Sequence, residues 1–353
     1  MSAPAVYPTG RAARDRFVLE RRGPRPLVDP WAPPRVVVDP EPDGAGGVVD
    51  VVTLFLTGRE CPWRCVMCDL WRETLETDTP PGAIPHQIRL ALTTASERSS
   101  GLGSELAPHV RRDLKLYNAG SFFDPRAVPP EDDQAIADAV AHAGRVTVES
   151  HPRLVGQRTW RFRDRLVPAL EVAMGLETVH PDALARLNKG CAVDDFAAAA
   201  AALAAHGVGL RVFLLVHPPF VPREERAEWL RRSIDVAVDA GAATIALIPT
   251  RGDTGAMPAL AELGEFVPAT LADLETSAAL ALNAVRRPVR RSVQSRVRVI
   301  ADLWDLQAFA TCSACLDARR ARLLRQNLEQ RVPEPIACAT CGATPPGGSR
   351  ACP

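Results

Sequence analysis

Three cysteines that lie close together, Cys61, Cys65 and Cys68, constrain what this chain can fold into more than any other feature of its sequence. They follow the apolar run Val51–Leu56 and have the spacing C-x3-C-x2-C. A structural zinc ion or an ordinary electron-transfer cluster binds four protein ligands, which close the metal off from chemistry. Three thiolates on a [4Fe–4S] cluster leave one iron without a protein ligand. The triplet therefore predicts an open iron–sulfur site directly after a strand.

Two simpler interpretations of the triplet stay open. A zinc site would need a fourth ligand nearby, and the next histidine, His86, lies beyond a proline-containing loop. A disulfide with a spare thiol is typical of a secreted protein, but the chain does not begin with an apolar signal-peptide core. Nine cysteines without such a signal favour metal ligands and predict a cytoplasmic protein.

The length and charge of the chain limit its architecture and its partners. Its 353 residues fit one large α/β domain with small appendages. No run of about 18 apolar residues is present, so we expect no membrane span. The formal net charge of zero argues against non-specific nucleic-acid binding but is compatible with a local basic face. We expect a proline-rich N-terminal extension over residues 1–47, a core over 48–285 and an arginine- and cysteine-rich segment over 286–353.

Six short apolar runs alternate with helical patterns along the predicted core. Strands each followed by a helix indicate parallel β/α winding, so the fold class is α/β, with a partial (βα)6 TIM-like barrel. Such barrels carry their chemistry at the carboxyl ends of the strands, and the cysteine triplet follows the first of them. A further short strand is expected at Val36–Val38. The six predicted strands are Val51–Leu56, Leu114–Tyr117, Val146–Val148, Leu170–Met174, Leu210–Val216 and Thr244–Ile248.

The triplet and its place after strand one resemble the radical S-adenosylmethionine (SAM) superfamily. The resemblance implies an enzyme whose open iron binds SAM and cleaves it reductively to methionine and a 5′-deoxyadenosyl radical, which then abstracts hydrogen from a substrate. It also implies an electron donor, a reductase or a flavodoxin- or ferredoxin-type protein. One departure is Met67, since the family often has an aromatic residue just before the third cysteine.

Residues at the ends of the later strands are candidates for contacts with SAM, as the resemblance implies. Gly120 and Ser121 follow strand two, and their positions match a glycine-rich turn that accepts from the SAM amino group. Glu149 ends strand three and is a candidate for the ribose hydroxyls or the amino group. Lys189 and Arg211 are candidates for the SAM carboxylate. An ordinary turn, an arginine-paired glutamate and simple packing residues are the alternatives.

Three phrases narrow the resemblance to one branch: Leu116–Asp124, Gly175–Thr178 and Leu187–Gly190. They resemble the archaeosine-biosynthesis radical SAM enzyme and, more distantly, the elongator catalytic subunit, over roughly residues 50–342. In that branch the archaeosine enzyme acts on a lysine-modified deazaguanine in tRNA, so the resemblance implies a modified tRNA base as substrate. A small molecule or peptide is the second candidate. A non-catalytic, zinc-dependent nucleic-acid-binding protein is the alternative of another class.

Four more cysteines form two C-x2-C units near the C-terminus, Cys312 with Cys315 and Cys338 with Cys341. Two such units complete a tetrahedral S4 site, although the 22 residues between them slightly exceed the usual spacing. Structural zinc and an auxiliary [4Fe–4S] cluster are both compatible. The preceding stretch 286–298 holds six arginines and no acid, which suits an RNA backbone or a solvated loop.

Lysine and asparagine are rare in this arginine-rich chain. Of its 42 basic residues only Lys115 and Lys189 are lysines, and asparagine occurs only at positions 118, 188, 283 and 327. Residues that persist against such a composition are enriched for necessity. We therefore expect several of these side chains to have a specific task.

Overall fold

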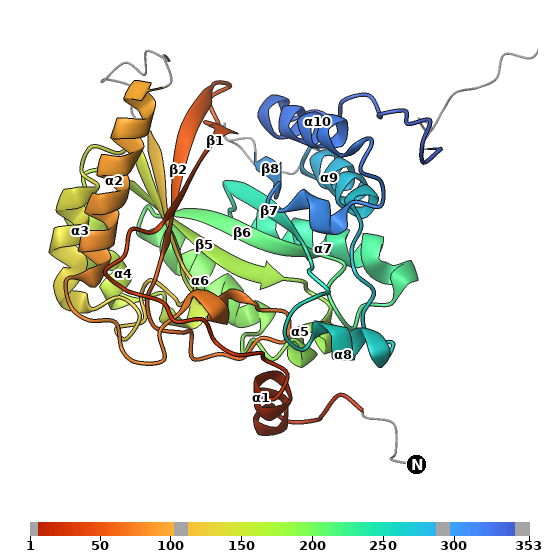
Figure 1. Ribbon diagram of the computed structural model, residues 1–353, viewed down its shortest axis with the longest axis horizontal. Helices are drawn as coiled ribbons and strands as arrows, with labels where there is room; N and C mark the ends of the chain where they lie inside the picture. Colours follow the sequence, from red (N-terminus) through yellow and green to blue (C-terminus); the bar gives the residue numbers. More distant parts are fainter. Residues whose placement is uncertain (1–5, 102–111, 287–296, 343–353) are drawn as a thin grey trace, which may run out of the picture.

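The centre of the computed structural model, which describes residues 6–101, 112–286 and 297–342, is an eight-stranded sheet with its strands in chain order (Figure 1). The first two strands are antiparallel, and all later neighbours are parallel. The predicted α/β barrel-like fold is therefore confirmed. The strands are β1 (Arg35–Pro42), β2 (Val48–Leu56), β3 (Asp113–Asn118), β4 (Arg145–Glu149), β5 (Ala169–Glu177), β6 (Gly209–Val216), β7 (Thr244–Pro249) and β8 (Arg298–Ala301).

Helices cover the outer face of the sheet, and others lie at its ends (Figure 1). Alternate residues of each strand, such as Val52 and Leu54 of β2, are fully buried in a core that also contains helix side chains such as Ile88 and Phe196. The residues between them, such as Thr53, face the barrel interior. The helices are α1 (Arg11–Leu19), α2 (Ala83–Gly101), α3 (Asp133–Ala139), α4 (Gln157–Arg165), α5 (Pro181–Arg186), α6 (Val193–Ala205), α7 (Arg226–Asp239), α8 (Met257–Glu262), α9 (Leu271–Val285) and α10 (Leu316–Glu329), with 3-10 turns at Leu70–Glu73, Pro130–Asp132, Pro152–Leu154, Arg223–Glu225 and Leu306–Phe309.

The six predicted strands are β2 to β7, and the short strand expected at Val36–Val38 is the middle of β1. Strand β8 was not predicted, because it has only four residues and begins at Arg298, inside the arginine-rich stretch. Arg298 itself is buried and donates to the backbone oxygen of Pro42 at 2.8 Å, which ties β8 to the end of β1. Residues 287–296 of the stretch lie outside the described residues.

Helix α10 takes the place of a neighbouring strand at the β8 edge. The amide of Asn327 both accepts from and donates to the backbone of Ala301, at 2.9 and 2.8 Å. The amide of Gln330 does the same for Val299, at 2.8 Å in both directions. Unpaired backbone groups at a buried edge are costly. The two side chains therefore form the hydrogen bonds that a further strand would make with the backbone of β8. Helix α10 also contacts β1.

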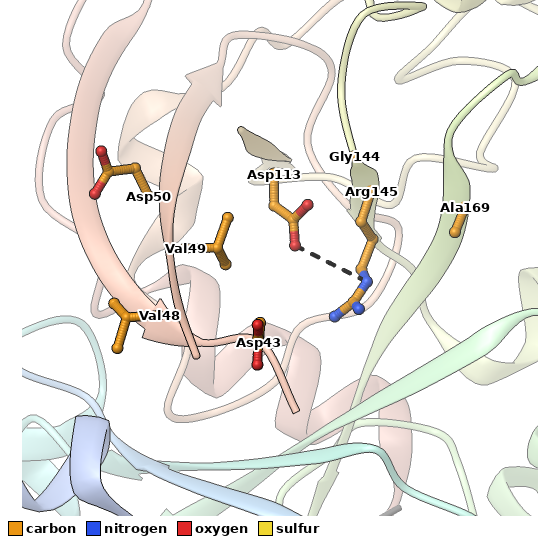
Figure 2. A pocket seen from close by; sticks show the side chains of 8 residues that line it. All are labelled: Asp43, Val48, Val49, Asp50, Asp113, Gly144, Arg145 and Ala169. Atoms are coloured by element: carbon orange, nitrogen blue, oxygen red, sulfur yellow. Dashed lines mark ion pairs between the residues drawn. The ribbon is translucent and has the colours of Figure 1, made fainter. Parts of the chain in front are cut away.

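Two cavities lie at opposite ends of the barrel. One of about 470 Å³ opens at the amino ends of the strands, lined by Asp113 and Arg145 among others (Figure 2). The other, of about 410 Å³, lies at the carboxyl ends of β5 and β6 and is lined by Glu177, His217 and residues of α7 and α9. The second cavity adjoins the end of the barrel that carries the cysteine triplet.

None of the helices in the described part of the chain combines the length and the apolar character that crossing a bilayer requires.

Candidate functional site

The cysteine loop, residues 61–68, leaves the carboxyl end of β2 and carries three half-buried thiols. Its backbone folds back on itself, and the N–H of Cys68 donates to the oxygen of Cys65 at 3.2 Å. Burial raises the pKa of Cys61 to about 11 and the pKa values of Cys65 and Cys68 to about 12, and for Cys68 the charge of Arg22 works against the effect of burial. The free thiols therefore stay protonated at neutral pH, so metal binding at this loop would release protons.

The donor chemistry of the three loop thiols fits an iron–sulfur cluster. In the described part of the chain, the compact group of candidate metal ligands consists of the four C-terminal cysteines, and the loop thiols are not part of it. A [4Fe–4S] cluster binds each thiolate to a different iron atom, so its ligands do not have to meet around one ion. Three half-buried thiols on one loop thus fit the cluster.

A buried ion pair lies beside Cys65. Lys189 Nζ lies 2.7 Å from Glu177 Oε1, and each side chain is 10% exposed. Burial opposes the charge of Lys189, but Glu177 and Cys65 outweigh it and raise the pKa of the amino group. A Cβ at Gly175 would collide with Glu177 Oε1 and lie 2.6 Å from Lys189 Nζ. Glycine at position 175 therefore leaves the room that this pair needs.

The phrase Leu187–Gly190 forms the surface on which the cysteine loop rests. The N–H of Val66 donates to the oxygen of Leu187 at 3.0 Å, and Asn188 Nδ2 donates to the oxygen of Arg64 at 2.9 Å. Gly190 has a φ of 70°, and a Cβ there would lie 2.9 Å from the Trp63 ring. Leu187 and Asn188 therefore hold the cysteine loop, and Gly190 leaves room for the Trp63 ring.

A stacked pair of rings joins the loop to the end of β4. Trp63 lies on His151 with ring centroids 3.5 Å apart and an interplanar angle of 8°. His151 Nε2 lies 3.1 Å from the backbone oxygen of Lys189, and its Nδ1 accepts from the N–H of Arg153. Burial and the charge of Lys189 lower the pKa of His151 to about 3. The imidazole is therefore neutral and packs between Trp63 and the backbone of Lys189. The sequence analysis singled out neither Trp63 nor His151.

Gly120 and Ser121 lie just after β3 and contact both the entrance of the cysteine loop and the end of β4. A Cβ at Gly120 would lie 2.6 Å from the oxygen of Arg59, so only glycine permits this close approach. Ser121 is 3% exposed, and its Oγ accepts from the N–H of His151 at 3.0 Å. The hydroxyl proton of Ser121 has no acceptor among the described residues. Contact with SAM stays a prediction for both.

Glu149 is a carboxyl group without a partner at the end of β4. Among the described residues its side chain has neither an ion pair nor a hydrogen bond. Burial raises the pKa of Glu149 to about 8, against the smaller opposing charges of Lys115 and Lys189. The group is therefore largely protonated at neutral pH, and a cationic ligand that binds beside it would favour loss of that proton.

We expect Glu149→Gln to stabilise the ligand-free protein more at pH 8 than at pH 5. The unfolded chain loses this proton near pH 4.5, whereas the folded chain keeps it up to about pH 8. The free energy of unfolding of the wild type therefore falls as pH rises through this window, by at most about 1.4 kcal/mol per pH unit, and that of the glutamine variant does not. Thermal unfolding of both proteins at the two pH values measures this. An equal difference in Tm at both pH values would contradict it.

Arg211 has two carboxylate partners of its own inside the barrel. It is 3% exposed, and its guanidinium donates to Glu41 at 2.7 Å and to Glu171 at 3.0 Å. Lys115, the other lysine of the chain, also pairs with Glu41, and Arg298 lies 3.6 Å from Glu171. Of the two predicted partners for the SAM carboxylate, Lys189 thus lies at the cysteine loop and Arg211 in a buried ion network.

The ends of β7 and β8 add charged residues that sequence reasoning missed. Arg251 donates to Asp305 at 2.6 Å and lies 3.9 Å from Asp69, which directly follows Cys68. Asp302 comes directly after β8, and burial raises its pKa. Asp302 and Asp305 were missed because the sequence did not indicate strand β8, which they follow. Three non-glycine residues at or beyond the carboxyl ends of β5, β6 and β8 have positive φ, namely Glu177, His217 and Asp305, and such strain gathers at functional sites.

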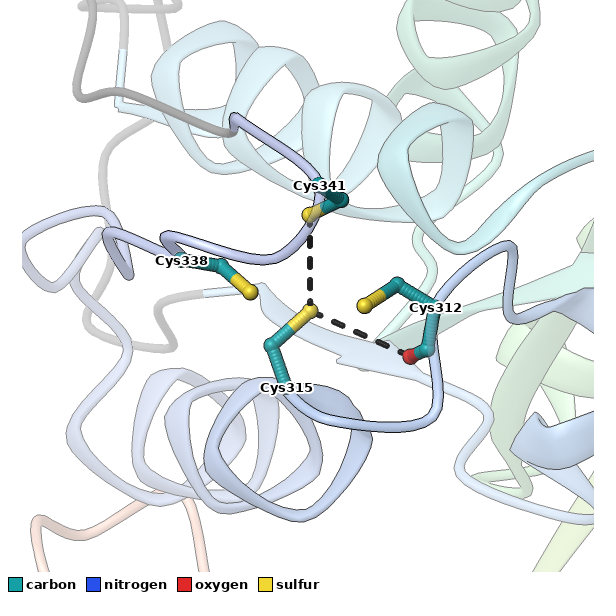
Figure 3. Close-up of side chains that lie close together, drawn as sticks. All are labelled: Cys312, Cys315, Cys338 and Cys341. Carbon is teal, nitrogen blue, oxygen red and sulfur yellow. Dashed lines mark hydrogen bonds between the residues drawn. The ribbon is translucent and has the colours of Figure 1, made fainter.

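The four C-terminal cysteines converge on one point (Figure 3). Their sulfur atoms all lie within 4.8 Å of one another, and Cys315 Sγ is 4.0 Å from Cys341 Sγ. Zinc–sulfur bonds of about 2.3 Å in a tetrahedron place sulfur atoms about 3.8 Å apart. The site therefore has the size of a single metal ion. Cys315 directly precedes α10, so the metal site lies at the start of the helix that closes the β8 edge.

Comparison with known proteins agrees with this fold and these motifs. No family model matches the chain. A protein of Methanosarcina acetivorans, archaeosine synthase subunit beta, is 34% identical over 131 residues, which are 35% of this chain and 38% of that protein. Its namesake from Thermococcus kodakarensis is 28% identical over 176 residues, 48% of this chain and 51% of that protein. The chain thus matches about half the length of these relatives or less.

A solved structure has the same fold. Elp3 of the archaeon Methanocaldococcus infernus matches 69% of this chain and 59% of its own, with a TM-score of 0.50 and 14% identity. The likeness concerns the fold alone, whereas the likeness to the archaeosine synthases lies in the sequence. The predicted resemblance is confirmed: over the parts that match, the sequence of this chain is similar to the archaeosine synthase beta subunits, and its fold is that of Elp3.

Proposed function

We propose that this chain is a radical SAM enzyme. The observation that carries the proposal is the triad of half-buried thiols at the carboxyl end of the first parallel strand, with the charges of the Lys189–Glu177 pair acting on Cys65. When bound, a [4Fe–4S] cluster would supply the electron that cleaves SAM. The chain's own residues bind, position and shield the reactants.

The cluster would be held by Cys61, Cys65 and Cys68, each as a thiolate. Lys189 places a fixed positive charge beside Cys65, which stabilises the negative charge that thiolate ligands bring into a buried site. Glu177 in turn fixes the lysine at 2.7 Å. The stacked rings of Trp63 and His151 pack the loop against the end of β4. These groups do not react; they keep the site in place and correctly charged.

Groups for SAM itself surround the loop. Glu149 offers a carboxyl without a partner among the described residues, suited to an amino group or to ribose hydroxyls. Ser121 offers a free hydroxyl proton, and the turn at Gly120 brings backbone close to the loop entrance. Lys189 is the better placed of the two candidates for the SAM carboxylate, since it lies at the cysteine loop, whereas Arg211 lies in the ion network inside the barrel.

For the four C-terminal cysteines we propose a single zinc ion. Four sulfur atoms within 4.8 Å of one another suit one tetrahedral ion, whereas a second [4Fe–4S] cluster would spread its four ligands over four irons. The ion has no free position for chemistry when four thiolates bind it. Its role would be structural.

The proposed substrate is a modified tRNA base. The support is the name of the sequence relatives, archaeosine synthase subunit beta, over the parts of the chain that match. A small molecule or peptide is the second candidate. The arginine stretch gives no structural support to either, because residues 287–296 lie outside the described residues and the flanking Arg286 and Arg298 bind backbone oxygens of the chain itself. A cytoplasmic location and a reductase, flavodoxin or ferredoxin as electron donor complete the proposal.

Anaerobic reconstitution with iron and sulfide tests the activity. We expect roughly four irons and four sulfides per chain in addition to zinc, and 5′-deoxyadenosine from SAM when dithionite supplies electrons. A reconstituted protein that retains only zinc and forms no 5′-deoxyadenosine would refute the proposal in favour of a zinc-dependent binding protein.

Binding of unmodified and modified tRNA at several salt concentrations tests the substrate class. Neutralised phosphates would make the affinity fall steeply with salt. An affinity for tRNA that is undetectable at low salt would favour the small-molecule class.

A further inference from the structure

The N-terminal arm, residues 7–34, runs from α1 along the cysteine loop to β1 (Figure 1). Its beginning is anchored in a buried cluster: Tyr7 is 4% exposed and Phe17 6%, and both pack with Phe220 and Leu187. The Tyr7 hydroxyl donates to the backbone oxygen of Arg186 at 2.7 Å. The arm is thus fixed on the side of the barrel that carries the proposed active site.

The middle of the arm binds the residue that precedes Cys61. Arg22 Nη1 lies 2.7 Å from Glu60 Oε1, and Arg25 Nη2 lies 2.5 Å from Glu60 Oε2, so each carboxylate oxygen has its own arginine. The side chains of Arg22 and Glu60 are only 7% and 11% exposed. Arg64, inside the loop, also lies 3.0 Å from Glu60 Oε1. Such sheltered, charge-assisted pairs are stronger than surface ion pairs.

Arg25 also reaches the chain that follows Cys68. Its Nη1 donates to the backbone oxygens of Trp71 at 2.9 Å and Thr74 at 3.0 Å. One guanidinium therefore joins the residue before the first cysteine to two residues after the third. The arm therefore contacts the chain on both sides of the cysteine loop.

A second set of contacts connects the arm to the cysteine loop through Asn188. Asp15 of α1 accepts from Asn188 Nδ2 at 2.7 Å, and the same nitrogen donates to the oxygen of Arg64. Asn188 has a φ of 61°, a left-handed conformation, and its side chain binds these two partners. The loop is thus held between the arm and the Leu187–Gly190 phrase.

We propose that the N-terminal arm positions the cysteine loop. Arg22 and Arg25 act through Glu60 to hold the three thiols at the spacing the cluster needs. The inference rests on the proposed function and extends it to residues outside the barrel. Cluster ligands must be held rigidly by groups around them, and these arginines supply that restraint from a segment distant in sequence. They are positioning residues and touch no reactant.

The test compares the double variant Arg22→Met/Arg25→Met and Glu60→Gln with Arg16→Met, an exposed arginine of the same arm. In the metal-free protein, we expect hydrogen exchange of residues 59–75 to rise about five- to thirtyfold over the control, as for any lost restraint of this strength. In the reconstituted protein, we expect the cluster's lifetime in air to shorten in the same variants. Arg22→Lys/Arg25→Lys should restore part of both, since lysine keeps the charge but not the fork.

The cluster's midpoint potential separates positioning from general loosening. Loss of two positive charges should lower the potential, and loss of the Glu60 charge should raise it, because nearby charge tunes such clusters. Shifts in one direction only, or exchange and lifetime equal to those of Arg16→Met, would overturn the inference. If the wild type takes up no cluster, the proposed function fails, and the exchange measurement still decides whether the arm restrains the loop.

Discussion

Cys65→Ala is expected to abolish 5′-deoxyadenosine formation and to leave the C-terminal zinc in place. Two thiolates cannot hold the cluster that three are proposed to hold, and Cys65 is a thiol whose pKa responds to the charges of both Lys189 and Glu177. Even residues that only support metal ligands change affinity or activity by about 10–100-fold, so loss of a ligand should exceed a hundredfold. Iron and sulfide content, the cluster's visible absorption and the rate of SAM cleavage measure the effect.

Cys191→Ala is the matched control for this variant. Cys191 is also a half-buried thiol and follows the Leu187–Gly190 phrase directly, but it lies outside the triad. We expect it to keep full iron content and activity. Undiminished SAM cleavage by Cys65→Ala, or an equal loss in Cys191→Ala, would show that the triad does not carry the reaction.

Cys315→Ser is expected to remove the C-terminal metal and to destabilise the whole barrel. The ion would tie the start of α10 to the segment that follows it, and α10 satisfies the backbone of Val299 and Ala301 through Gln330 and Asn327. A helix that loosens there leaves buried donors and acceptors unpaired and opens a strand edge to aggregation. Structural zinc contributes several kcal/mol to folding, so we expect Tm to fall by roughly 5–10 °C, with faster hydrogen exchange in β8.

Metal analysis of the same samples makes this prediction specific. In Cys315→Ser, zinc should fall from about one ion per chain to near zero, while the iron content of the cysteine loop stays unchanged. The control variant Cys191→Ser should keep both its zinc and its iron. Loss of zinc without loss of Tm would mean that the metal does not hold α10. Iron rather than zinc at this site would contradict the single-ion assignment.

Much of the barrel could be predicted because its six central strands are locally encoded. Runs such as Val51–Leu56 carry apolar residues on both faces and are long enough to be recognised as strands from the local sequence alone. Strand β8 is the counterexample: four residues beginning with Arg298 form a strand because Ile245, Ala246 and their neighbours in β7 pair with them, and because α10 supplies the missing edge. No local pattern records that pairing.

The rare residues were informative in the same way. Both lysines are engaged in ion pairs inside the barrel or at its mouth, Lys115 with Glu41 and Lys189 with Glu177. Asn188 holds the cysteine loop, and Asn327 closes the β8 edge. The sequence indicated that these positions matter, but not with which partner.

The sequence by itself determined the chemistry that the chain carries: a three-cysteine loop after the first parallel strand, a separate four-cysteine site, and the strand ends where polar residues gather. These depend on spacing along the chain, which is local. Only the tertiary structure decided which polar groups serve the loop, because side chains distant in sequence compete for the same charges. Arg211 is taken by Glu41 and Glu171, Lys189 lies beside Cys65, and arginines 22 and 25 reach Glu60 from an arm that looked like a mere extension.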